Sequence, residues 1–126
     1  MPTDITIRAE GIELPAELND SETAQALVSR LPLEVEMSRW GDEYYGDVGD
    51  DLGVRVAADA RAEMSVGEIA YWPTGNAVCI FFGPTPASSG DMPVAASPVN
   101  PVGEVTGDVS RLKALGGSVT IELARA

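Results

Sequence analysis

Apolar and polar residues alternate along several short stretches of the chain, a pattern typical of strands with one buried face. Residues 3–9 alternate through Ile5 and Ile7, and residues 12–18 resume the alternation after Gly11. Because glycine readily adopts the backbone conformation of a tight turn, the two stretches together predict a β-hairpin.

Period-two alternation predicts strands elsewhere as well. We expect them in residues 33–40, around Val54 and Val56, and in residues 67–72, 77–82, 100–105 and 118–126. Residues 77–82 differ from the others because both of their faces are apolar, so both faces must be covered. We expect one face to enter a barrel or sandwich core, and the other to lie under a helix or to line a pocket.

Two segments have helical spacing instead. Apolar residues at positions 24, 27, 28 and 31 form one stripe, which predicts a helix over about residues 20–30. Asn19 and Glu22 resemble a capping box at its start, and Pro32 prevents its continuation. A second, shorter helix is expected to begin after Asp108 as N-cap.

The remaining segments are rich in residues that favour turns. Residues 40–51 combine Gly and Asp and are expected to form a turn followed by an extended loop. Residues 83–98 are dense in Pro, Ser and Gly, and a loop of about 16 residues in so short a chain is often functional. These elements add up to a mainly β protein of six to eight strands and two short helices.

The length of the chain, 126 residues, is enough to bury one sizeable core but not two, so we expect a single domain over residues 1–126. No stretch approaches the roughly 18 consecutive apolar residues that a membrane span needs. The first ten residues have neither the basic nor the apolar region of a secretory signal. We therefore expect a soluble, cytoplasmic protein with no membrane partner.

The charge of the chain is strongly negative, with 20 acidic and 8 basic residues and a net charge of −12. Such a surface repels phosphate backbones, so we expect no nucleic-acid partner. A salt-rich cytoplasm, a GC-rich genome and an ordinary soluble surface with spare negative charge are all compatible with this acidity, and composition does not separate them.

The residues available for chemistry are limited. The chain has no histidine, which excludes His-dependent triads and His metal sites. With Cys79 as the single cysteine, it has no internal disulfide and no thiolate metal site of its own. We expect Cys79 to pack in a buried strand rather than to act as a nucleophile.

Carboxylates are the other candidates for chemistry. Asp47, Asp50 and Asp51 carry the oxygen ligands that calcium or magnesium prefers, but they fit no EF-hand spacing and are interpreted as an ordinary acidic loop. Glu43 and Glu68 are conceivable as a catalytic carboxylate pair, but nothing in the sequence places them together. We therefore expect neither a metal nor a cofactor.

Three strings of the chain resemble a known family. RWGDEYYGDV (residues 39–48), GEIAYWPTGNAVCIFFGPTP (67–86) and ASPVNPVGEVTGDVSRLK (96–113) are similar to segments of small prokaryotic cyclophilin-like proteins of unknown function. The resemblance covers nearly the whole chain. It implies a closed or nearly closed antiparallel β-barrel of about eight strands, capped at its ends by two short helices.

The resemblance to true prolyl isomerases covers fewer positions. It places Phe82 on the pocket phenylalanine of those enzymes and Tyr71 on a methionine of the neighbouring strand. Their catalytic arginine donates a hydrogen bond toward the prolyl nitrogen, and its nearest match here is Arg39. Ile80 stands where those enzymes have a glutamine. Arg39 is thus a weak catalytic candidate, and a solvated strand arginine is the interpretation that we favour.

Amphipathic aromatics lie either in a ligand groove or at a closed barrel end, and the sequence leaves both open. The candidate ligand-binding residues are Trp40, Tyr45, Tyr71, Trp72, Phe82 and Met92. The leading hypothesis is a binding module, monomeric or homodimeric, that takes a peptide or small-molecule ligand in an aromatic groove on the barrel. The alternatives are a weak or atypical peptidyl-prolyl isomerase, and a small enzyme with another reaction.

Overall fold

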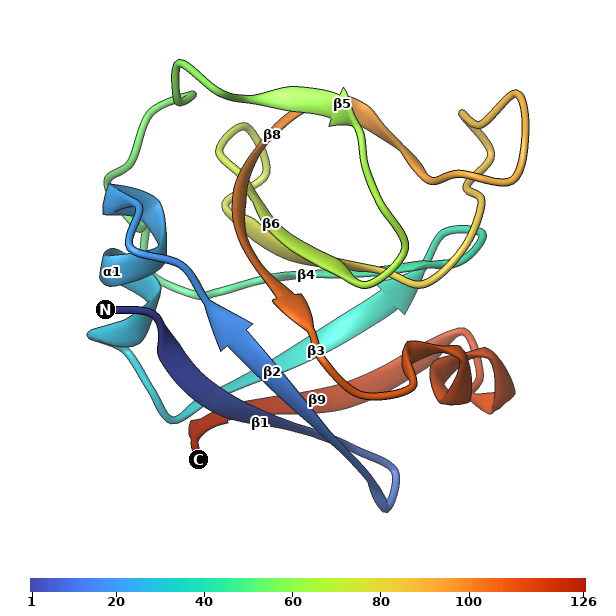
Figure 1. Cartoon of the computed structure of the whole chain (residues 1–126), viewed down its shortest axis with the longest axis horizontal. Helices are drawn as coiled ribbons and strands as arrows, with labels where there is room; N and C mark the ends of the chain where they lie inside the picture. The colour runs from blue at the N-terminus through green and yellow to red at the C-terminus, as the bar shows by residue number, and fades with distance from the viewer.

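The protein is a β-barrel in which eight antiparallel strands form a ring (Figure 1). The computed structural model describes residues 1–126. Around the ring the strands follow the order β2-β1-β9-β3-β4-β7-β6-β8, and the pairing of β2 with β8 closes it. A ninth strand, β5, pairs with β8 outside the ring. The strands are β1 (Thr3–Ala9), β2 (Ile12–Leu18), β3 (Leu33–Arg39), β4 (Glu43–Asp47), β5 (Arg61–Glu63), β6 (Glu68–Trp72), β7 (Ala77–Phe81), β8 (Val94–Val105) and β9 (Ser118–Arg125).

Alternation along the strands fills the barrel interior with apolar side chains. Ile5 of β1 and Val35 and Met37 of β3 are buried there, as their spacing predicts. The rings of Tyr44 and Phe82 stack in the same interior, with centroids 5.3 Å apart. The closed antiparallel barrel that the sequence predicts is therefore confirmed.

The predicted N-terminal hairpin is also confirmed. Strands β1 and β2 pair along their whole length, from Thr3 opposite Leu18 to Ala9 opposite Ile12. A two-residue turn joins them, and both of its residues, Glu10 and Gly11, have positive φ angles of 49° and 82°. This conformation matches the twist of paired strands, which explains why one of the two positions is a glycine.

The two helices lie at opposite ends of the barrel (Figure 1). Helix α1 (Glu22–Val28) buries Ala24 and Leu27 in the core. It is shorter than the 20–30 segment predicted, because its N-cap is Ser21, whose Oγ accepts a hydrogen bond from the Ala24 amide at 3.1 Å. The 3₁₀ helix η1 (Val109–Ala114) begins after Asp108 as predicted. Neither helix has the length and apolar composition needed to cross a membrane.

Strand β8 has two halves with different partners. Residues 100–105 pair with β6 and β2 in the ring, whereas residues 94–99 pair with β5. The register of the β6–β8 pairing shifts between Ile69 and Ala70, and the pairing ends at Tyr71 opposite Asn100. Residues 61–63 and 94–99 thus form a two-stranded arm over the outer face of β6 and β7, which we call the arm.

The arm covers the second apolar face of β7. Cys79 and Phe81 of β7 pack beneath it against Met64, Ala95 and Val99. The opposite face of β7 belongs to the barrel core. Both faces of this strand are therefore covered, as its sequence predicts, but the cover is a pair of strands rather than a helix.

The sequence predictions for the middle of the chain were wrong in three places, and in two of them a strand replaces a predicted loop. Residues 43–47 form strand β4 instead of a loop, because β3 and β7 pair with them on either side. Strand β8 begins at Val94 rather than near residue 100, because β5 provides a partner for its first half. Long-range pairing therefore decides both segments, and local composition does not.

No strand forms around Val54 and Val56 either. The buried side chain of Asn100 holds this segment through its backbone. Its Nδ2 donates to the Arg55 carbonyl at 2.9 Å, and its Oδ1 accepts from the Ala57 amide at 2.8 Å. One asparagine thus replaces the neighbouring strand that an extended segment normally requires.

Candidate functional site

A pocket of about 250 Å³ lies between the arm and the outer face of β4, β7 and β6. Seven of its nine lining residues are hydrophobic, so its walls are mainly apolar. The lining residues are Trp40, Glu43, Tyr45, Trp72, Cys79, Ala95, Ala96, Ser97 and Val99. We call this cavity the aromatic pocket. Concave, mostly apolar cavities with a few polar groups are the usual ligand sites of proteins.

The turn between β3 and β4 supplies one side of the aromatic pocket. Trp40 and Glu43 close this turn with two backbone hydrogen bonds, from the Trp40 amide to the Glu43 carbonyl (2.8 Å) and from the Glu43 amide to the Trp40 carbonyl (3.2 Å). Strand β4 then places Glu43 and Tyr45 on the outer face, because the residue between them, Tyr44, points into the barrel. The alternation of β4 therefore delivers a carboxyl group and a phenol ring to the same cavity.

The opposite side comes from the end of β6 and from the arm. Trp72 is the last residue of β6, and its indole Nε1 donates a hydrogen bond to Ser97 Oγ at 2.7 Å. This bond connects the barrel wall to the arm across the rim of the aromatic pocket. It uses one acceptor position of the hydroxyl of Ser97, which is one of the two non-hydrophobic lining residues.

The second non-hydrophobic residue that lines the aromatic pocket is Glu43, whose carboxyl group is almost fully buried. The residue is 5% exposed, and its Oε1 has no hydrogen-bond partner. The pKa of Glu43 is raised from its ordinary 4.5 to about 7. Burial is the main cause of this rise, and the interaction with the neighbouring Cys79 thiol offsets a part of it. A buried polar atom without a partner is rare in folded proteins and calls for an explanation.

The Cys79 thiol has little nucleophilic character in this setting. Burial is the main cause that raises its pKa well above the ordinary value, and the nearby Glu43 raises it further. The thiolate, which is the reactive form of cysteine, is therefore disfavoured. Cys79 serves as an apolar part of the pocket floor, in agreement with its packing in the cluster beneath the arm.

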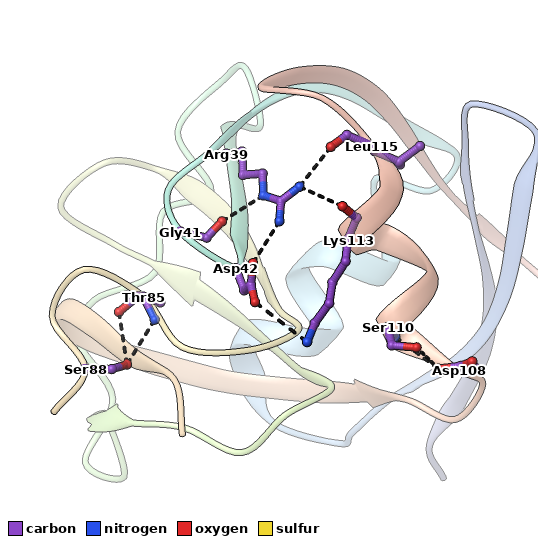
Figure 2. A network of polar contacts seen from close by, with 9 residues as sticks. All are labelled: Arg39, Gly41, Asp42, Thr85, Ser88, Asp108, Ser110, Lys113 and Leu115. Carbon is purple, nitrogen blue, oxygen red and sulfur yellow. Dashed lines mark hydrogen bonds and ion pairs between the residues drawn. The ribbon is translucent and has the colours of Figure 1, made fainter. Parts of the chain in front are cut away.

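Arg39 lies at the end of the barrel rather than in the aromatic pocket (Figure 2). Its guanidinium donates to the carbonyl oxygens of Gly41 (2.8 Å), Lys113 (3.1 Å) and Leu115 (2.8 Å), and to Asp42 Oδ1 (2.8 Å). The group also lies over the Phe82 ring, 5.1 Å from its centroid. This network joins the β3–β4 turn to η1, so Arg39 is engaged in holding the barrel end together and is not the solvated strand arginine that we favoured.

The six aromatic and methionine candidates fall in three places. Trp40, Tyr45 and Trp72 line the aromatic pocket together. Tyr71 and Phe82 are 0% and 1% exposed in the barrel core, on the other side of the β-sheet wall. Met92 is 52% exposed and borders a separate surface hollow beside the loop before β8. The structure thus brings half of the predicted set into one cavity.

The carboxylate candidates are also separated. Glu68 forms an ion pair with Arg61, with Nη2 and Oε2 2.6 Å apart, and does not line the aromatic pocket with Glu43. Asp47 and Asp51 accept hydrogen bonds from the amides of Gly49 (2.7 Å) and Gly53 (2.9 Å) in their own loop. No group of three His, Cys, Asp or Glu side chains is placed to hold a metal ion.

Sequence reasoning missed the contribution of the arm to this cavity. Ala95, Ser97 and Val99 lie in a segment that was expected to be mostly loop, and only their pairing with β5 brings them over the barrel. From the sequence, Glu43 is a candidate only as the partner of Glu68. The signal that identifies it is the alternation of residues 43–45, which puts Glu43 and Tyr45 on one face.

Comparison with known proteins agrees with this architecture. A model of the family described as Cyclophilin-like matches residues 3–123. The chain is also similar to the solution structure of a hypothetical protein from Archaeoglobus fulgidus, with 31% sequence identity and a TM-score of 0.78, over 99% of this chain and 95% of that one. No curated protein matches the chain.

Proposed function

The chain belongs to the cyclophilin-like family, and we propose that it is a binding module that takes a small molecule or a peptide side chain in the aromatic pocket. The observation that carries this proposal is the buried Oε1 of Glu43, which has no hydrogen-bond partner within the protein and belongs to a residue that lines an apolar cavity. Leaving such an atom without a partner costs roughly 1–3 kcal/mol. A ligand that offers a hydrogen-bond donor and an apolar group recovers that cost.

A second candidate, an enzyme of another reaction, is favoured by one observation. A carboxyl group with a pKa of about 7 is suited to general acid–base catalysis near neutral pH. However, the other potentially reactive groups of the pocket are not activated, since the hydrogen-bond partner of Ser97 Oγ is the Trp72 indole rather than a base, and Cys79 is held as a thiol. A single proton-transfer group without a nucleophile or an oxyanion-stabilising partner supports binding better than catalysis.

The isomerase alternative gains no support from the site. Its chemistry needs a hydrogen-bond donor aimed at the prolyl nitrogen, and the Arg39 donors are directed at three carbonyl groups and Asp42 instead. An assay of prolyl-peptide isomerisation at high protein concentration tests this point. We expect no acceleration over the uncatalysed rate, and a clear acceleration contradicts the non-catalytic part of the proposal.

Ligand binding itself is tested by NMR with the ¹⁵N-labelled protein. The chain has two tryptophans, Trp40 and Trp72, and both line the aromatic pocket, so their indole N–H signals report on it directly. We expect a mixture of small amines, amides and short peptides to shift these two signals. If no component shifts either signal, the aromatic pocket is not a binding site under those conditions and the proposal fails.

A pair of variants controls for indirect effects. Tyr45→Ala removes a partly exposed wall of the aromatic pocket and is expected to weaken any binding found. Val56→Ala removes an exposed apolar side chain outside the pocket and is expected to leave binding unchanged. Equal effects of the two variants indicate that the ligand binds elsewhere.

A further inference from the structure

The aromatic pocket contains one buried carboxylate oxygen without a hydrogen-bond donor, Glu43 Oε1. Glu43 forms no ion pair with any of the eight basic residues, and no lysine or arginine lines the cavity. Oε1 is an acceptor whenever the carboxyl group is ionised, so what it lacks is a donor. A positively charged donor meets this requirement best, because the attraction between opposite charges adds to the hydrogen bond with the carboxylate.

The walls of the cavity favour the same kind of ligand. Trp40, Tyr45 and Trp72 are aromatic, and aromatic rings attract organic cations through their negative faces, most strongly for tryptophan. Ala95 and Val99 offer apolar surface for a carbon chain. Aromatic rings, apolar surface and one carboxylate together make a site for a cation with an organic tail, rather than for an inorganic ion or an acid.

The field of the whole protein acts in the same direction. A net charge of −12 raises the local concentration of cations and lowers that of anions around the molecule. The size of the cavity limits the ligand: about 250 Å³ is below the roughly 300–1,000 Å³ of sites for drug-sized molecules. The site therefore accommodates one group of about the size of an amino-acid side chain.

We propose that the aromatic pocket binds an alkylammonium group, with the ammonium N–H on the Glu43 carboxylate and the carbon chain against Trp40 and Trp72. The group is either a free small amine or the lysine side chain of a peptide. This inference rests on the proposed binding function and names the ligand class for the same site. It assigns Glu43 the role of the residue that determines specificity.

Three ligands of one shape and different charge test the inference. Phenethylamine is a cation, phenethyl alcohol is its neutral isostere, and phenylacetate is the corresponding anion. Each is titrated into the protein at about pH 8, above the Glu43 pKa of about 7, with the indole signals of Trp40 and Trp72 as the readout. We expect the amine to bind roughly ten- to a hundredfold more tightly than the alcohol, and the anion to bind most weakly.

Two carboxamide variants show whether Glu43 causes the preference. Glu43→Gln is expected to bring the affinity for the amine down to that for the alcohol, while the alcohol binds about as before. Glu34→Gln makes the same change of charge at an exposed position of β3 outside the pocket, and is expected to keep the preference. If Glu43→Gln keeps the preference as Glu34→Gln does, net charge rather than Glu43 attracts the amine, which overturns the inference.

The outcomes separate the two proposals. If the alcohol binds as tightly as the amine, the pocket binds ligands but is not an ammonium site, so the inference fails and the binding function stands. If none of the three ligands moves either indole signal, the inference fails, and the wider ligand mixture decides whether the binding function fails with it.

The source of the ammonium group is tested in the same way. Short peptides with a central lysine are compared with the same peptides carrying norleucine, which lacks the ammonium group. A preference for the lysine peptides over free phenethylamine identifies a peptide as the source. A preference for the free amine identifies a small molecule.

Discussion

The buried carboxyl group of Glu43 makes a quantitative prediction about stability. Burial raises its pKa from 4.5 to about 7 in the folded protein, whereas in the unfolded chain the group titrates near 4.5. The folded state therefore binds the Glu43 proton more tightly, and stability from this group is fully present below about pH 4.5. As the pH rises through the interval up to about 7, the unfolded chain releases the proton first, and this stability is lost.

The magnitude follows from the size of the shift. A difference of about 2.5 pKa units at about 1.4 kcal/mol per unit gives about 3 kcal/mol. We therefore expect the free energy of unfolding of Glu43→Gln, relative to the unmodified protein, to increase by about 3 kcal/mol between about pH 4 and pH 8. The other carboxylates titrate in both proteins, so their contributions cancel in the difference. The Cys79 thiol is protonated throughout this range and does not add to it.

Urea denaturation followed by tryptophan fluorescence measures this difference at a series of pH values. The prediction concerns the slope with pH and not the value at any one pH, because the amide of the glutamine brings its own unpaired donors. Glu34→Gln is the matched control, because it makes the same side-chain change at an exposed position of β3. A constant difference for Glu43→Gln would refute the reasoning, since it means that Glu43 titrates normally in the folded state.

Three further predictions concern the framework around the aromatic pocket. Arg39→Lys keeps the charge but not the fork of donors, so we expect a loss of roughly 2–3 kcal/mol in urea denaturation, with unchanged affinity for pocket ligands. Gly46→Ala places a Cβ 2.4 Å from the Glu36 carbonyl oxygen, and we expect it to lower the thermal midpoint clearly, while Gly116→Ala, with nothing within 4 Å of its Cβ, does not. Asn100→Asp removes the donors to Thr23 Oγ1 and the Arg55 carbonyl, and limited proteolysis is expected to cut residues 53–60 faster in this variant than in the parent.

Much of the barrel follows from the sequence because its strands carry their own signal. β1, β2, β3 and β9 have one wet and one buried face, so alternation identifies them directly. In β4 burial alternates only from Tyr44 to Asp47, and its glycine and aspartate residues favour a loop locally. It is a strand because β3 and β7 are already on either side of it, and this tertiary effect is absent from local composition.

The site follows from the sequence in part. Tyr71 and Trp72 are successive residues of β6, so they point to opposite faces, and only Trp72 reaches the aromatic pocket. Strand periodicity alone therefore separates these two, although both were proposed for the groove. The position of Ala95 to Val99, which cover the aromatic pocket, does not follow from strand periodicity. It depends on β8 leaving the ring to pair with β5, and no local pattern in the sequence indicates that departure.

One pairing of the barrel, between β1 and β9, joins strands from opposite ends of the sequence. Ile7 of β1 lies opposite Leu123 of β9, whereas the strands around the aromatic pocket, from β4 to β8, all come from the continuous stretch of residues 43–105. During synthesis the ring cannot close until β9 has left the ribosome, and folds dominated by such distant pairings form on the millisecond-to-second scale. Strands β4 to β8, which carry the aromatic pocket, do not pair with β9. The order of synthesis therefore allows them to pair with one another before the barrel is complete.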